Sequence, residues 1–110
     1  MKIAKIDIFK RRVVFFDNRE EMDKYLKYSN SEQINDACCK GICIAFDNEY
    51  YIGVFDNSLA VLAHEINHAC FCICDDTGVE LDNGNRETFC YMSEYLFKIF
   101  SKEILKKQSP

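Results

Sequence analysis

The sequence of 110 residues has the usual length of one compact domain, and its 48% hydrophobic and 29% charged residues exclude the polar excess of a disordered chain. The formal net charge is −4, and the basic residues are scattered apart from short groups at 10–12 and 106–107. A nucleic-acid-binding surface normally needs a larger basic footprint, so none is expected. We expect a single domain over residues 1–110.

Neither a membrane span nor an export signal is evident. The longest nearly apolar run, 59–74, is too short to cross a bilayer and is interrupted by His64, Glu65, Asn67 and His68. Asp7 interrupts the first apolar stretch, and basic residues follow it where an export signal would have a small-residue cleavage site. The sequence therefore predicts a cytoplasmic protein that contacts no membrane.

Seven cysteines are many for this length, but their odd number argues against a disulfide framework and predicts reduced thiols. Three of them form a C-x-C-x-C run at Cys70, Cys72 and Cys74. Zinc sites built from cysteine usually use two C-x2-C knuckles, and neither this run nor the group at 38–43 supplies two. We interpret these residues as small hydrophobic packing groups.

The first half of the chain predicts two hairpins around a helix. Apolar and polar residues alternate over 3–9 and a β-prone run covers 13–16, which predicts a hairpin that turns at 10–12. Asp17 or Asn18 then caps a helix over 19–28, in which the residues on one face are Met22, Tyr25 and Leu26. A polar loop over 29–36 precedes a second hairpin with strands over 41–46 and 50–55.

The second half predicts two helices joined by a loop. Residues 56–58 offer N-cap oxygens for a helix that runs to about 73, whose core-facing residues are expected to be Leu59, Leu62, Ile66, Ala69 and Ile73. The segment 75–85 contains two glycines and reads as a loop, and Asn85 caps a final helix over 86–107. This order of elements predicts an α+β domain, a small antiparallel sheet with helices packed against it.

The two histidines of the chain lie four residues apart, in the motif His64-Glu65-Ile66-Asn67-His68. Residues i and i+4 of a helix share one face, so both imidazoles can reach one ion, and the residue at i+1 can reach a water molecule beside it. Zn²⁺ suits two imidazoles and a carboxylate. The motif therefore predicts His64 and His68 as zinc ligands and Glu65 as a general base.

A third protein ligand has to come from further along the chain. The pattern H-E-x-x-H-x-x-G-x-x-H is excluded, because Phe71 and Cys74 replace its glycine and third histidine. Asp75 and Asp76 remain possible, whereas Glu80 lies in the loop without periodicity to aim it. Glu87 is favoured, since it opens the last helix, where the helix dipole helps to keep a carboxylate ionised.

Three segments, 63–69, 75–79 and 85–91, together resemble the small zincin-like proteins encoded by bacteriophages and prophages. The resemblance covers about residues 50 to 105, with a specific first motif and a loose second one. It implies a minimal zincin fold with an H-E-x-x-H helix and a long C-terminal helix, with the ligands His64, His68 and Glu87 and the base Glu65. Arg86 and the cysteines have no counterpart in the family pattern.

These patterns predict a zinc-dependent hydrolase, in particular a metallopeptidase acting on a peptide or protein substrate. Tyr91 follows Glu87 by one helical turn and is a candidate to stabilise the oxyanion, with Tyr95 and Arg86 as alternatives. The strand over 50–55 precedes the motif helix, and it could pair with an extended peptide. The alternative function is that of a phage-encoded zinc protein that binds or inhibits a host protein without turnover, in the host cytoplasm.

Overall fold

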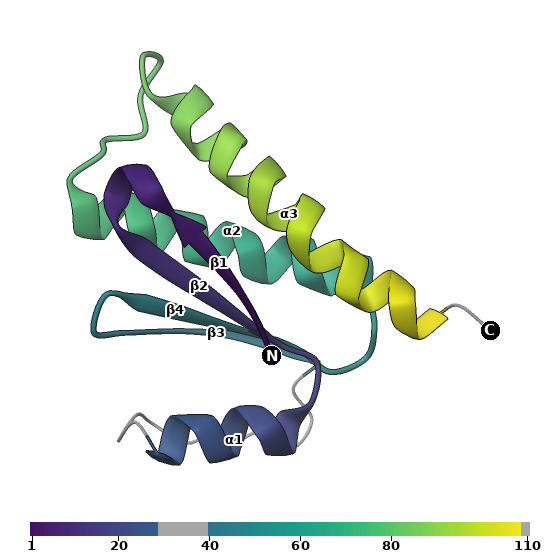
Figure 1. Ribbon diagram of the computed structural model, residues 1–110. Coiled ribbons are helices and arrows are strands. Elements are labelled where there is room, and N and C mark those ends of the chain that lie inside the picture. Colours follow the sequence, from purple (N-terminus) through teal and green to yellow (C-terminus); the bar gives the residue numbers. More distant parts are fainter. Residues whose placement is uncertain (29–39, 109–110) are drawn as a thin grey trace.

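The computed structural model describes residues 1–28 and 40–108 (Figure 1). In this part the strands are β1 (Lys2–Ile6), β2 (Arg11–Phe16), β3 (Gly41–Phe46) and β4 (Glu49–Val54). The helices are α1 (Arg19–Tyr28), α2 (Leu59–Thr77) and α3 (Arg86–Gln108), with a short 3₁₀ turn at Asp7–Phe9. Both expected hairpins, the motif helix and the long last helix are confirmed, whereas the polar loop expected over 29–36 lies outside the described residues.

The sheet is mixed, so the prediction of an antiparallel sheet is wrong. Its strand order among the described residues is β1-β2-β4-β3. The two hairpins are antiparallel, but β2 pairs with β4 in parallel, with Val13 opposite Tyr50 and Phe15 opposite Ile52. β2 and β4 are therefore central strands, and central strands are buried on both faces.

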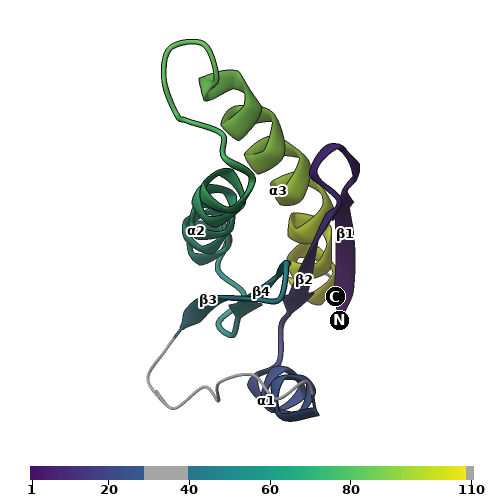
Figure 2. The same ribbon diagram turned by 90° about the vertical axis from the view of Figure 1, so that its left-hand side faces the viewer.

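Helices cover both faces of the sheet, as Figure 2 shows from the side. Alternate residues of a strand point to opposite faces, so Val13 and Phe15 pack with α2 and α3, whereas Val14 and Phe16 pack with α1. On the α3 side the ring of Phe15 stacks on that of Phe100, with centroids 5.2 Å apart. These two cores hold the layers together.

None of the helices within the described ranges combines the length and apolar character that crossing a bilayer requires.

The ends of α2 follow from local chemistry. Ser58 Oγ accepts a hydrogen bond from the backbone N–H of Val61 at the start of the helix. The helix continues to Thr77, four residues beyond the expected end, so the loop begins later than predicted. Gly78 ends it in the left-handed conformation, φ 75°, and its N–H donates to the carbonyls of Cys74 and Asp75. The added turn brings Cys74, the last residue of the cysteine run, into the helix.

Both hairpin turns contain residues with positive φ. Asp47 and Asn48 join β3 to β4 with φ of 52° and 64°, as a two-residue hairpin turn requires. β1 ends at Ile6, earlier than the expected strand over 3–9, because the 3₁₀ turn and Lys10, with φ 54°, reverse the chain there.

Candidate metal centre

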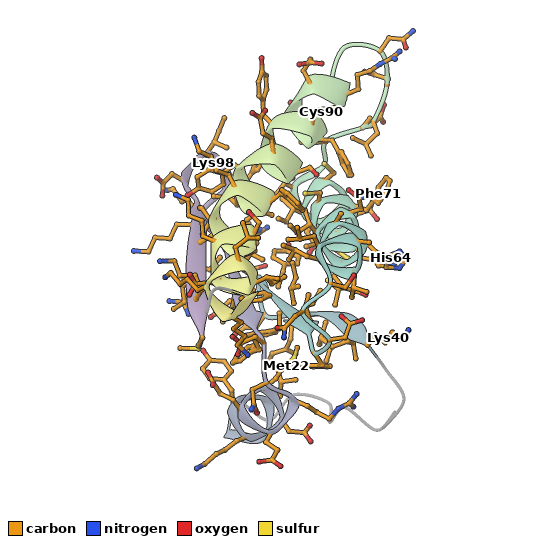
Figure 3. The ribbon with its side chains drawn as sticks, turned by 90° about the vertical axis from the view of Figure 1, so that its right-hand side faces the viewer. Met22, Lys40, His64, Phe71, Cys90 and Lys98 are labelled. Atoms are coloured by element: carbon orange, nitrogen blue, oxygen red, sulfur yellow. The ribbon has the colours of Figure 1, made fainter. Side chains whose placement is uncertain are left out.

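The two histidines of the motif lie side by side on the exposed face of α2. Their Nε2 atoms are 3.1 Å apart, and their rings meet nearly edge to face with centroids 4.8 Å apart. Figure 3 shows His64 projecting from α2 on the side away from α3. The opposite face of the helix is buried in the core as predicted, with Leu59 only partly covered. The amphipathic pattern of α2 thus directs both imidazoles to solvent.

Glu65 points to a different flank of the same helix, towards the start of β3. Its residue surface is only 7% exposed. Burial raises the pKa of its carboxyl group, and the neighbouring His64 and His68 act in the opposite direction. One donor atom from each of these three residues lies within 4.8 Å of the others. The motif therefore forms a compact group of two exposed imidazoles and one buried carboxylate.

Gly41 provides the space for this carboxylate. A Cβ atom at Gly41 would collide with Val61 Cγ1, and it would come within 3.0 Å of Glu65 Oε2 and 3.1 Å of the Gly53 carbonyl oxygen. Gly41 could not be identified as part of the site from the sequence, because its pairing with Val54 is not evident from local sequence and its approach to α2 is long-range. Its only signal was a glycine at the start of an expected strand.

We expect Gly41→Ala to lower the free energy of unfolding by about 1–3 kcal/mol and to displace the Glu65 carboxylate, because the added methyl overpacks this corner. Chemical denaturation checks the first effect. Gly84→Ala is the matched control, since a Cβ atom there would meet only Asp82 Oδ1, at an ordinary 3.4 Å. Equal stability of the two variants would contradict the close packing of β3 on Glu65.

The donor atoms fit a zinc ion. Zinc–nitrogen bonds are about 2.0–2.1 Å long, so two imidazole nitrogens on a tetrahedral zinc ion lie about 3.3 Å apart. The observed 3.1 Å between the Nε2 atoms of His64 and His68 differs from that spacing by a few tenths of an ångström. A small rotation of either ring is enough to remove the difference. The spacing of the histidine pair is thus compatible with two ligands on one zinc ion.

The cysteines of the described residues do not join this group. Those in the described residues are free thiols, and Cys70 and Cys74 are buried in the core. Burial raises the pKa of Cys70 and Cys43 to about 12 in each case, which disfavours the thiolate that binds metal. The interpretation of the C-x-C-x-C run as packing groups is confirmed for Cys70 and Cys74. Cys38 and Cys39 lie outside the described residues.

Asp76, one of the alternative third ligands, already has a hydrogen-bond partner. The Tyr50 hydroxyl donates to Asp76 Oδ2 at 2.6 Å, which ties the end of α2 to β4. Cys74, at the position that replaces a third histidine, has 1% of its surface exposed. Asp75 and Glu80 are both exposed, Asp75 near the end of α2 and Glu80 in the following loop. Neither belongs to the group formed by the motif residues.

The two predicted site residues of α3 are not brought together with the histidines. Glu87 is exposed in the first turn of the helix and lies outside the group of donor atoms around His64. Tyr91 is 66% exposed and lines a depression of about 280 Å³ together with Ile6 and Asp7, near the end of β1. Of the other oxyanion candidates, Tyr95 donates its hydroxyl to the Lys5 carbonyl oxygen, and Arg86 donates to Asn83 Oδ1.

The free edge of the described sheet beside the motif belongs to β3, not to the strand expected. β4 hydrogen-bonds to β2 on one side and to β3 on the other, so the prediction that the strand over 50–55 pairs with an extended peptide is wrong. β3 is an edge strand of the described sheet, and its first residue, Gly41, lies against Glu65. Any strand addition next to the motif has to use β3.

The resemblance to small zincin-like phage proteins rests on segments that the structure places in the middle of α2, at the end of α2 and the start of the following loop, and in the first turns of α3. These are the elements that would build such a site. Comparisons with protein-family models, with curated proteins and with solved structures gave no match to this chain.

Proposed function

We propose that this chain is a zinc-dependent hydrolase that cleaves peptide bonds, with His64 and His68 as zinc ligands and Glu65 as the general base. The observation that carries the proposal is the grouping of the donor atoms: two Nε2 atoms 3.1 Å apart, and a carboxylate oxygen within 4.8 Å of both side chains. The chemistry of this set, two imidazoles with an adjacent acidic group, matches a hydrolytic zinc site.

In this proposal the two histidines would bind the metal ion and Glu65 would transfer protons. When bound, zinc supplies a Lewis acid that polarises a carbonyl group and lowers the pKa of water towards neutrality. The exposed imidazoles would hold the ion where substrate can reach it. The Glu65 carboxylate, held by the close packing of Gly41 and Val61, would accept the proton of the attacking water and then donate it to the leaving amine.

The position of β3 supports a peptide as the substrate. An edge strand can bind an extended chain through its free N–H and C=O groups, and β3 is paired on one side only among the described residues. A peptide lying along β3 would pass Gly41, which contacts the flank of α2 that carries Glu65. This arrangement of a motif helix beside an edge strand, followed by a second helix, is the basis on which we propose a minimal zincin-like fold.

We retain Glu87 as the proposed third ligand, which requires the first turn of α3 to approach the face of α2 that carries the histidines. Glu87→Gln is expected to weaken zinc affinity at least about tenfold, because it removes a charged ligand. Competition with a chelating dye measures the affinity. Asp75→Asn is the matched control on the end of α2. Full affinity in Glu87→Gln with reduced affinity in Asp75→Asn would assign the ligand to Asp75 instead.

A second function has an observation in its favour. Glu87 and Tyr91 lie outside the group formed by the motif, and both histidines are exposed, which suits a zinc-containing protein that binds or inhibits a host factor without turnover. Incubation of the zinc-loaded protein with a peptide library separates the two functions. Cleavage products that require Glu65 support the hydrolase, and binding without cleavage supports the inhibitor.

A further inference from the structure

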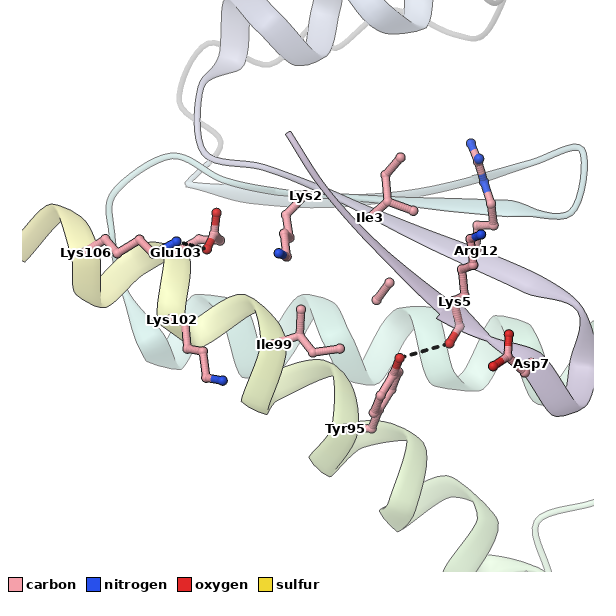
Figure 4. Close-up of a pocket in the computed structure, with 11 residues that line it drawn as sticks. Lys2, Ile3, Lys5, Asp7, Arg12, Tyr95, Ile99, Lys102, Glu103 and Lys106 are labelled. Atoms are coloured by element: carbon pink, nitrogen blue, oxygen red, sulfur yellow. Dashed lines mark hydrogen bonds and ion pairs between the residues drawn. The ribbon is translucent and has the colours of Figure 1, made fainter.

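We propose that the groove between β1 and α3 binds an extended acidic segment of a partner protein, by strand addition to β1. This groove has a volume of about 760 Å³ (Figure 4). β1 and β3 are the opposite edges of the described sheet, so the groove is separated from the β3 edge beside Glu65 by three strand spacings, about 14 Å. The proposed hydrolase does not use it.

The charge of the groove is opposite to that of the chain. Five basic residues line it and only two acidic ones, Asp7 and Glu103, whereas the whole chain has a net charge of −4. Two of the basic groups are neutralised within the protein: Arg12 pairs with Glu49 at 2.9 Å and Lys106 with Glu103 at 3.0 Å. The remaining three have no ion pair within the described residues and are Lys2, Lys5 and Lys102.

The backbone of β1 has hydrogen-bonding groups to offer on this side. The Tyr95 hydroxyl donates to the Lys5 carbonyl oxygen at 3.1 Å, so the backbone groups of Lys5 point away from β2 and towards α3. In an antiparallel ladder every second residue has this orientation. The N–H and C=O of Ile3 therefore point outward as well, where they can pair with a new strand. Tyr95 limits the length of that strand at Lys5.

The lysines would meet an added strand on both of its faces. Lys2 is opposite Phe15, which packs with α2 and α3, so Lys2 shares that face of the sheet with Lys102 of α3. Lys5 is opposite Arg12 and lies on the other face. Side chains of an added strand alternate between these faces, so successive acidic residues would each approach a lysine. A continuous acidic run is the best match.

The length of the groove also suits a short peptide strand. Tyr95 and Lys106 mark its ends on α3, eleven residues apart and thus about 16 Å along the helix axis. Five residues of an extended chain cover the same length. A nucleic acid would not use the outward N–H and C=O groups of Ile3. The combination of these backbone groups with the nearby lysines therefore points to a polypeptide.

The test is a titration of the isotopically labelled, full-length protein with a five-glutamate peptide at low ionic strength, followed by NMR. We expect the amide signals of Ile3 and Lys5 to shift, and the matched five-glutamine peptide to bind at least about tenfold more weakly. Lys102→Glu should raise the Kd about tenfold, since it reverses one charge in the groove. Lys98→Glu, the same change on the same helix but outside the groove, should leave the Kd within about twofold.

A second variant tests strand addition itself. Ile3→Pro removes an N–H that points away from β2, a change that an edge strand tolerates, and it should abolish peptide binding while the fold is retained. The proposal is overturned if the β1 amides do not shift, if Lys98→Glu weakens binding as much as Lys102→Glu, or if Ile3→Pro folds and binds normally. Tighter binding of a single-stranded oligonucleotide through the same lysines would also overturn it, in favour of a nucleic-acid site.

Discussion

Glu65→Gln is expected to reduce kcat/KM for peptide hydrolysis by about 10²–10⁴-fold while the fold and the bound zinc are retained. The amide has the size of the carboxylate and fits the same space beside Gly41, but it cannot accept a proton from water. Cleavage of a peptide library by the zinc-loaded proteins measures the loss, and elemental analysis measures the zinc. Circular dichroism confirms that both proteins are folded.

Glu80→Gln is the matched control, because Glu80 is an exposed carboxylate in the loop after α2, outside the motif. It should retain wild-type activity. Equal activity of Glu65→Gln and wild type would remove Glu65 from the proton transfer. Loss of zinc in Glu65→Gln would show that Glu65 holds the ion together with the two histidines, in which case the division between ligands and base on this helix is wrong.

The elements that could be predicted from the sequence are those specified by local chemistry. The helical spacing of Leu62, Ile66, Ala69 and Ile73 predicted the buried face of α2, and the same spacing predicted that His64 and His68 would meet. Likewise, the residues at 47 and 48 are of the type that allows a tight hairpin, and β3 and β4 pair around them. These features depend on neighbours within a few residues.

The pairing of β2 with β4 depends on contacts between distant residues, and its direction was predicted wrongly. Arg12 and Glu49 are partners in the register although they are 37 residues apart in sequence. One signal was present: Val13 to Phe16 is a continuous apolar run, which is typical of a strand buried on both faces rather than of one with a solvent-exposed face. This run distinguishes a central strand from an edge strand.

The orientation of the α3 residues could not be predicted for a related reason. Spacing of i+4 predicts that Glu87 and Tyr91 share a face of the helix, but it does not predict which neighbour that face meets. In the structure Phe89 contacts Phe71 of α2, with ring centroids 4.7 Å apart, while Tyr91 faces the turn after β1. Helix packing over the sheet decides this orientation, and the proposed role of Glu87 therefore requires its own test.

Replacement of both histidines, His64→Ala with His68→Ala, is expected to eliminate the binding of about one zinc ion per chain, and each single variant should weaken zinc affinity at least about 100-fold. Both side chains are exposed on α2, so the metal-free double variant should be as stable as the metal-free wild type within about 0.5 kcal/mol. Asn67→Ala is the matched control, an exposed residue on the same turn of the helix.

Zinc should therefore stabilise the wild type and Asn67→Ala but not the double variant. At a free zinc concentration 100 times the Kd, the expected gain in the free energy of unfolding is about 2.7 kcal/mol, which thermal denaturation with and without a chelator measures. A double variant that still binds one zinc ion and gains the same stability would place the ion elsewhere. It would then have to be held by groups such as the thiols, and the proposed hydrolase would have no metal next to its base.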